Sequence, residues 1–297
     1  MVSRFRRRPL AGVVFVLIVA VAGCQAPDPL GRPLIGITSV YEVPEQDEAP
    51  RTTVSFAYVK AVADNGGIPL VLPTIGEEPI LATYLEVLDG LVLVGGDDIP
   101  PQAYGEQPHG TVEPLPEQRY DFERKLIARW LESGKPLLGV CLGMQFTSVV
   151  AGGTMVQDIP SEIGTQVDHR AYHRVEIEPG SLLAELLEAR EARVLSNHHQ
   201  AVDDVPQGFR VIARSADGVT EALERTEGGF GLFVQWHPEA MTDRAHRDAI
   251  YGALVRAARQ RTGAGRRGAP AESRTDGSDR GCSSPTFLST AASGSME

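Results

Sequence analysis

The chain has 297 residues, of which 42% are hydrophobic and 23% charged, and its formal net charge at pH 7 is −11. A surface this acidic argues against binding to nucleic acid and against electrostatic attachment to anionic lipid. The three cysteines, Cys24, Cys141 and Cys282, lie far apart. No two of them have metal-ligand spacing, and none has an obvious disulfide partner, so each has to be interpreted by its local context.

The first 23 residues have the pattern of a targeting signal. An arginine-rich start precedes an uncharged apolar run over 10–22, which is too short for a comfortable membrane span. The run ends at Val21-Ala22-Gly23-Cys24, which resembles the lipobox of bacterial lipoproteins. We therefore predict a signal peptide over 1–23, lipidation of Cys24, a linker over 24–32 and export to the bacterial cell envelope. An ordinary cleaved signal or an uncleaved anchor are the alternatives.

Apolar runs suited to buried parallel strands alternate with amphipathic helical segments along residues 33–260. This alternation predicts one three-layer α/β/α domain with a mainly parallel central sheet. Residues 261–297 are rich in Gly, Ser, Arg and Thr and are predicted to be a disordered tail. The predicted strands are 34–38, 69–72, 91–94, 136–140, 193–195, 209–213 and 230–235, and the predicted helices include 56–63, 122–131 and 250–257.

Cys141 follows one of these apolar runs, and Gly139 and Gly143 flank it two positions away on either side. A strand that enters a sharp strand-to-helix turn has this pattern, and the turn exposes its central side chain at the carboxyl edge of the sheet. Small flanking residues are needed there because the backbone is crowded and strained. A cysteine that served only to fill the core would not need that setting.

His237 and Glu239 follow the last predicted strand, two residues apart. A thiol nucleophile needs a base, and the base needs a group that fixes its tautomer. We therefore predict a triad of Cys141, His237 and Glu239. The alternative is a core cysteine and an unrelated surface His-Pro-Glu segment, but the two halves together favour the triad.

These segments are similar to the class I glutamine amidotransferase superfamily, and within it the chain most resembles the gamma-glutamyl-gamma-aminobutyrate hydrolases. The resemblance covers residues 33–260. It is carried by the start of the first strand at 33–38, Gly95-Gly96-Asp97-Asp98, the Cys141 turn with its continuation to residue 159, Asn197-His198-His199-Gln200, and Trp236-His237-Pro238-Glu239.

The resemblance implies a flavodoxin-like sheet and a hydrolase that cleaves γ-glutamyl amides of small molecules through a thioester on Cys141, without a cofactor. The backbone amides of Leu142 and Gly96 would form the oxyanion hole. The oligomeric state stays open, with a homodimer as one option. A glutaminase subunit that feeds ammonia to a synthetase is one alternative function, although export argues against it. A lipid-anchored binding protein without turnover is the other, although the intact triad argues against it.

Gly95, Gln145, His198 and His199 are the expected substrate contacts in this interpretation. Gln145 is equally interpretable as the first polar residue of a helix. The paired histidines do not predict a metal site, because adjacent residues rarely aim at one ion and no cysteine or carboxylate completes a set. Two further histidines, at positions 169 and 173, precede a strand-like segment and are assigned surface or structural roles.

One departure from the family pattern concerns the residue after the nucleophile. The family usually has an arginine there, whereas this chain has Leu142, and Ser148 stands where an asparagine is usual. We expect the amide of Leu142 to keep its role, while its side chain forms an apolar wall in place of a bidentate carboxylate donor. Substrates whose amine carries a carboxylate would then be comparatively poor.

Overall fold

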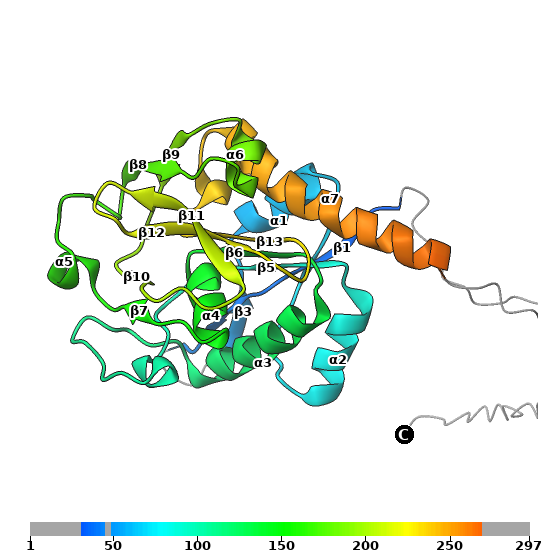
Figure 1. Cartoon of the computed structure of the whole chain (residues 1–297). Coiled ribbons are helices and arrows are strands. Elements are labelled where there is room, and N and C mark those ends of the chain that lie inside the picture. The colour runs from blue at the N-terminus through cyan, green and yellow to red at the C-terminus, as the bar shows by residue number, and fades with distance from the viewer. Residues whose placement is uncertain (1–30, 45–48, 269–297) are drawn as a thin grey trace, which may run out of the picture.

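The computed structural model describes residues 31–44 and 49–268 (Figure 1). Five parallel strands form the centre of the sheet in the order β4-β1-β5-β6-β13. Each lies within one residue of an apolar run predicted as a strand, so the mainly parallel α/β core is confirmed. The strands are β1 (Leu34–Ile37), β4 (Ile68–Val71), β5 (Gly90–Leu93), β6 (Leu137–Val140) and β13 (Gly231–Val234).

An antiparallel extension continues the same sheet beyond β13, in the order β12-β11-β8-β9. The sequence predicted part of it but not β12, and the strand-like segment expected after His173 is β8, which already begins at Tyr172. The extension consists of β8 (Tyr172–Ile177), β9 (Glu191–Leu195), β11 (Phe209–Ser215) and β12 (Thr220–Arg225). The short strand β10 (Ala201–Val202) pairs with β12 and with β7 (Met155–Val156). Strands β2 (Val40–Glu42) and β3 (Arg51–Thr53) form a separate antiparallel pair.

Helices cover both faces of the sheet (Figure 1). One face carries α1 (Phe56–Asp64), α6 (Leu182–Leu187) and α7 (Arg244–Gly268), and the other carries α2 (Glu78–Val87), α3 (Glu117–Ser133) and α4 (Leu142–Val150). The short helix α5 (Ile159–Glu162) lies near β7 and β10, and 3₁₀ turns span η1 (Pro101–Tyr104) and η2 (Pro238–Ala240).

Alternation along the strands divides the interior into two cores. Val92 and Val94 pack with α1 and α7, whereas Leu91 and Leu93 pack with α2, α3 and α4. This follows from the two-residue period of a strand, which sends successive side chains to opposite faces. Since both faces are covered, these strands appear in the sequence as continuous apolar runs.

One sequence prediction is corrected by the helices. The apolar stripe expected along 56–63 includes Phe56, but Phe56 is 74% exposed, and Tyr58, Ala61 and Val62 form the buried face of α1. The domain boundary predicted at residue 260 lies inside α7, which runs to Gly268. Arg261 connects this part of the helix to the end of α3 by donating to the backbone oxygen of Ser133 at 3.1 Å.

The predicted signal peptide, the lipidation site at Cys24 and most of the predicted tail lie outside the described residues. Within the described ranges, none of the helices combines the length and the apolar character that crossing a membrane requires.

Candidate active site

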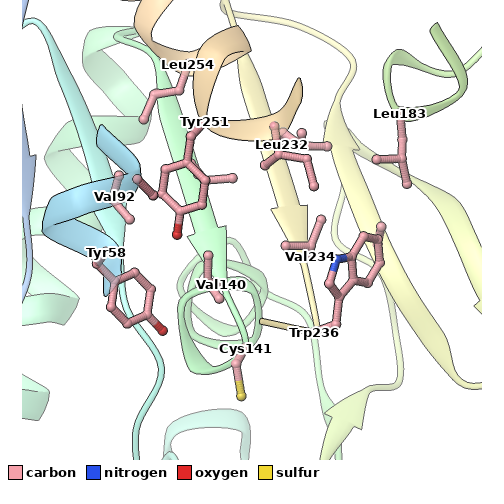
Figure 2. Packing of buried hydrophobic residues seen from close by; sticks show 14 of the residues in the cluster. Tyr58, Val92, Val140, Cys141, Leu183, Leu232, Val234, Trp236, Tyr251 and Leu254 are labelled. Carbon is pink, nitrogen blue, oxygen red and sulfur yellow. The ribbon is translucent and has the colours of Figure 1, made fainter. Parts of the chain in front are cut away.

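The predicted turn at Cys141 is present between β6 and α4. Cys141 has a φ of 53° and a ψ of −110°, a conformation that residues with a Cβ rarely adopt. A Cβ on Gly139 would lie 2.7 Å from the backbone oxygen of Gly143, and one on Gly143 would lie 2.5 Å from that of Leu93. The crowding that the sequence predicted therefore requires both glycines. Figure 2 shows the sulfur of Cys141 pointing away from the apolar cluster.

His237 and Glu239 lie next to Cys141 because β13 is the parallel neighbour of β6, with Val234 opposite Val140. Nδ1 of His237 donates to Oε1 of Glu239 at 2.7 Å, which fixes the imidazole. Burial alone would lower the pKa of His237, but hydrogen bonds with Cys141 and Glu239 outweigh it and raise that pKa to about 10. The structure thus brings together the three predicted residues.

The Gly95-Gly96 turn follows β5, on the other side of β6. A Cβ on Gly95 would lie 3.0 Å from Cε1 of His237 and 3.6 Å from Cβ of Cys141, so this turn borders the cysteine and histidine directly. The N–H of Gly95 donates to the hydroxyl of Tyr58 at 3.1 Å. Gly96 is therefore the glycine that can contribute an oxyanion donor together with the amide of Leu142, which opens α4 and has no intrahelical acceptor.

A buried ion pair on α3 holds this turn. Nε of Arg119 lies 3.0 Å from Oε1 of Glu123, and both side chains are fully buried. Nη2 of the same arginine donates to the backbone oxygen of Gly95 at 2.9 Å. A Cβ on Gly96 would overlap the guanidinium. Sequence analysis missed the pair, although two charged residues on the apolar stripe of a helix were a visible signal.

Tyr58 on α1 and Tyr251 on α7 lie close to Glu239, and Figure 2 shows their hydroxyls on the side of the core that faces Cys141. The hydroxyl of Tyr58 lies 3.5 Å from Nδ1 of His237. Burial raises the pKa of both tyrosines, and the charge of Glu239 adds to the effect. Both hydroxyls therefore stay neutral beside Glu239 at physiological pH. The sequence analysis singled out neither tyrosine.

Two glutamines form a polar chain behind the nucleophile. Nε2 of Gln235 lies 3.7 Å from Sγ of Cys141, and Oε1 of Gln235 accepts from Nε2 of Gln145 at 3.3 Å. Gln145 also donates to the backbone oxygen of Gln200 at 3.1 Å. Gln145, predicted as a substrate contact, is buried and engaged with protein groups. Gln235, which sequence analysis missed, makes the closer contact with the sulfur.

The side chain of Leu142 is fully buried in the core between the sheet and α3. The expectation that it forms an apolar wall of the substrate pocket is therefore wrong. Cys141 itself is only 6% exposed, less than the predicted turn implied, and the turn directs the side chain after it into the core. The amide of Leu142 keeps its predicted place at the start of α4.

The neighbouring histidines of the substrate prediction point to different groups. Nε2 of His199 lies 3.2 Å from Asp98 and its Nδ1 lies 3.3 Å from Asp158, and its side chain is 19% exposed. His198 is 2% exposed and faces Glu221 at 3.8 Å. The two side chains therefore diverge, and His199 is the one with surface left to meet a small molecule.

Comparison with known proteins identifies the family. A family model for peptidase C26 matches residues 33–239. The chain belongs to the peptidase C26 family. It is thus one of the class I glutamine amidotransferase-like hydrolases, as the sequence predicted.

Two curated relatives and one solved structure illustrate the likeness. Protein NtpR of Enterococcus hirae is 37% identical over 219 residues, covering 70% of this chain and 91% of NtpR. The gamma-glutamyl-gamma-aminobutyrate hydrolase of Escherichia coli K12 is 32% identical over 201 residues, covering 63% of this chain and 78% of the relative. The structure of a proposed GMP synthase subunit from Thermoplasma acidophilum superposes with a TM-score of 0.54 at 19% identity, covering 78% of this chain and 98% of the other, which shows the fold.

The pKa of His237 should fall when Glu239 is replaced by glutamine. The carboxylate favours the imidazolium, so its removal should let His237 lose its proton at lower pH than in the wild type. NMR titration of ¹⁵N-labelled histidines, with the signal assigned by its loss in His237→Gln, measures this directly. The exposed Glu227→Gln serves as the charge-matched control. An unchanged midpoint in Glu239→Gln would contradict the proposed orientation of the base.

Leu142→Arg should destabilise the fold because it buries a guanidinium without a partner. The expected loss is about 3–5 kcal/mol of unfolding free energy. Leu142→Met, which keeps the volume and the apolar character, should cost less than about 1.5 kcal/mol. Urea denaturation of both variants measures the difference. Equal stability of the two would mean that the side chain reaches solvent after all.

Proposed function

We propose that the protein hydrolyses γ-glutamyl amide bonds, with Cys141 as nucleophile. The observation that carries the proposal is the meeting of Cys141, His237 and Glu239 beside a strained turn at the carboxyl edge of the sheet, where Glu239 holds His237 by a hydrogen bond of 2.7 Å and Cys141 helps to raise the pKa of His237. A buried cysteine with a merely structural role needs neither the left-handed backbone nor a histidine held at 2.7 Å by a carboxylate.

The chemistry follows from the positions of these groups. The thiolate of Cys141, favoured by the N-terminus of α4, attacks the amide carbonyl, and the oxyanion forms against the amides of Gly96 and Leu142. As the C–N bond breaks, His237 gives its proton to the leaving amine. Water then attacks the thioester and passes a proton to His237, and the C–S bond breaks to release glutamate and the thiolate.

The γ-glutamyl part of the proposal is supported by kinship. A relative that is 32% identical is named a gamma-glutamyl-gamma-aminobutyrate hydrolase. The same machinery would act on glutamine if the protein were a glutaminase subunit, because both substrates present the same γ-carbonyl. The two functions differ in the leaving group, which is ammonia in one case and a larger amine in the other.

Cys141→Ala should lower turnover of γ-glutamyl substrates by about 10⁴-fold or more, because removing the nucleophile disables the whole triad. Cys282→Ala, the same change in the C-terminal segment, is the matched control and should retain wild-type rates. The panel should include glutamine, γ-glutamyl-gamma-aminobutyrate, a γ-glutamyl dipeptide and an α-glutamyl isomer, with release of glutamate measured.

Each outcome of this panel has a distinct meaning. Cleavage of the γ-glutamyl amides but not of the α-isomer supports the proposal. Release of ammonia from glutamine alone would identify a glutaminase. Binding of γ-glutamyl compounds by calorimetry without any turnover would identify a binding protein and overturn the enzymatic function.

We also propose that a lipid on Cys24 anchors the protein in the bacterial cell envelope. The arginine-rich start, the short apolar run and Val21-Ala22-Gly23-Cys24 support it. Attachment would have to be covalent, because an acidic body has no electrostatic attraction for anionic lipid.

Cys24→Ser should move the protein from the membrane fraction to the soluble fraction, or leave it unprocessed. The reason is the loss of an acyl chain, which contributes about 0.8 kcal/mol per buried methylene. Cell fractionation with mass measurement of the mature N-terminus tests it, with Cys282→Ser as the control. Wild-type protein found wholly in the soluble fraction would refute lipidation.

A further inference from the structure

Three histidines and a glutamate converge inside the antiparallel extension of the sheet. His169 precedes β8, His173 lies on β8, His198 follows β9 and Glu221 lies on β12. Their side chains are 4%, 7%, 2% and 0% exposed. One potential ligand atom from each lies within 4.8 Å of all the others. Segments distant in the sequence thus meet at one buried point.

The proton of each imidazole is fixed on the side that faces away from this point. Nε2 of His169 lies 3.0 Å from a carboxylate oxygen of Asp217, and Nδ1 of His198 lies 2.9 Å from the backbone oxygen of Gln200. Nδ1 of His173 lies 3.1 Å from the backbone oxygen of Arg174. These oxygens can only accept, so each outer nitrogen carries the hydrogen. In a neutral imidazole the inner nitrogen then presents a lone pair.

The inner nitrogens surround one carboxylate oxygen. Oε1 of Glu221 lies 3.1 Å from Nδ1 of His169, 3.4 Å from Nε2 of His173 and 3.8 Å from Nε2 of His198. Ligands at zinc-bond lengths of about 2.0–2.1 Å in a tetrahedron are separated by about 3.3–3.4 Å, a value that lies within the range of these three distances. The hydroxyl of Ser196, 2.9 Å from Nε2 of His173, is the further polar neighbour.

Apart from Nε2 of His173, these inner atoms have no hydrogen bond. Among the described residues, Nδ1 of His169, Nε2 of His198 and both carboxylate oxygens of Glu221 are buried without a hydrogen bond. Burying a carboxylate in this way is costly unless a cation or a donor balances it. The lone pairs of the inner nitrogens and the negative charge of the Glu221 carboxylate repel one another, and a cation between them would turn this repulsion into attraction.

We propose that His169, His173, His198 and Glu221 bind one Zn²⁺ ion. Imidazole nitrogens favour zinc-class transition metals over Mg²⁺ and Ca²⁺, which prefer oxygen ligands. The outer hydrogen bonds, including that to Asp217, are the contacts that orient metal-binding histidines. Four protein ligands close the coordination sphere, so the ion is structural and does not activate water. A cavity of about 220 Å³ that His169 and His198 line gives the ion a route of entry.

The proposed zinc site is connected to the catalytic residues through the segment that carries His198. The backbone oxygen of Leu195 accepts from the N–H of His237 at 2.9 Å, and that of Gln200 accepts from Gln145 at 3.1 Å. The N–H of Gln235 donates to the backbone oxygen of Glu221 at 2.8 Å. A bound ion would therefore fix both ends of this segment. The inference does not depend on the proposed reaction.

Elemental analysis of the untagged full chain, purified without chelators, is the first test. We expect about one zinc per chain, as for a closed four-ligand site. His198→Ala and Glu221→Gln should each reduce the content at least tenfold, whereas the exposed His109→Ala should retain it. Zinc that is lost equally from all three variants would place the ion elsewhere and overturn the assignment.

Cobalt substitution tests the site in the wild-type protein, so the result does not depend on whether the variants fold. After removal of metal with dipicolinate, added Co²⁺ should give the visible absorption of a tetrahedral nitrogen–oxygen site, and Zn²⁺ should abolish it. Zn²⁺ but not Mg²⁺ should also restore the Tm lost on chelation. Wild-type protein that contains no metal and gives neither a cobalt spectrum nor a Tm response to Zn²⁺ would show that the four side chains form a metal-free hydrogen-bonded cluster.

Discussion

The backbone of Cys141 is the constraint on which the rest of the site depends. A residue with a Cβ held at a φ of 53° costs about 1–3 kcal/mol and persists only when its surroundings impose it. The N–H of Cys141 donates to the backbone oxygen of Val234 at 2.8 Å, so the strained residue remains bonded to β13. Gly143 is in close approach to Leu93 on the opposite side. The nucleophile is therefore clamped between β5 and β13, the strands that supply the oxyanion turn and the base.

The buried pair of Arg119 and Glu123 extends this constraint to the oxyanion turn. Ion pairs in a protein interior seldom add stability, because the loss of hydration offsets their attraction. Burial raises the pKa of Glu123, and the charge of Arg119 opposes that shift. The pair is better explained by its contact with the backbone oxygen of Gly95, which fixes the orientation of the peptide that joins Gly95 to Gly96. The free energy spent on burying the pair therefore serves to hold an oxyanion donor in position and does not serve to stabilise α3.

The parallel core and the triad could be predicted because each leaves a local mark in the sequence. Buried parallel strands are continuous apolar runs, and the Cys141 turn needs its two glycines. Strand β12 leaves no such mark, since Glu221 and Glu224 interrupt it although its interior is buried. The direction of the Leu142 side chain is set by the turn in three dimensions, which the family pattern could not reveal. The charges of Arg119 and Glu123 on an apolar stripe were a signal in the sequence, but Arg119 and Gln235 act through contacts across the fold, so the groups that they bind could not be predicted.

The antiparallel extension explains how residues so far from Cys141 in the sequence reach its site. A strand that runs antiparallel to its neighbour returns the chain to the edge from which it came, so the loop after β9 lies beside the carboxyl end of β13. There Leu195 bonds His237 and Gln200 bonds Gln145, one on each side of His198. The backbone bond between Gln235 and Glu221 places the buried histidine cluster one strand away from the nucleophile's polar contacts. A displacement of β12 or of this loop would therefore reach the catalytic histidine through backbone hydrogen bonds, which are shorter and stiffer connections than side-chain packing. The parallel half supplies the reacting groups, and the antiparallel half holds the last of them in place.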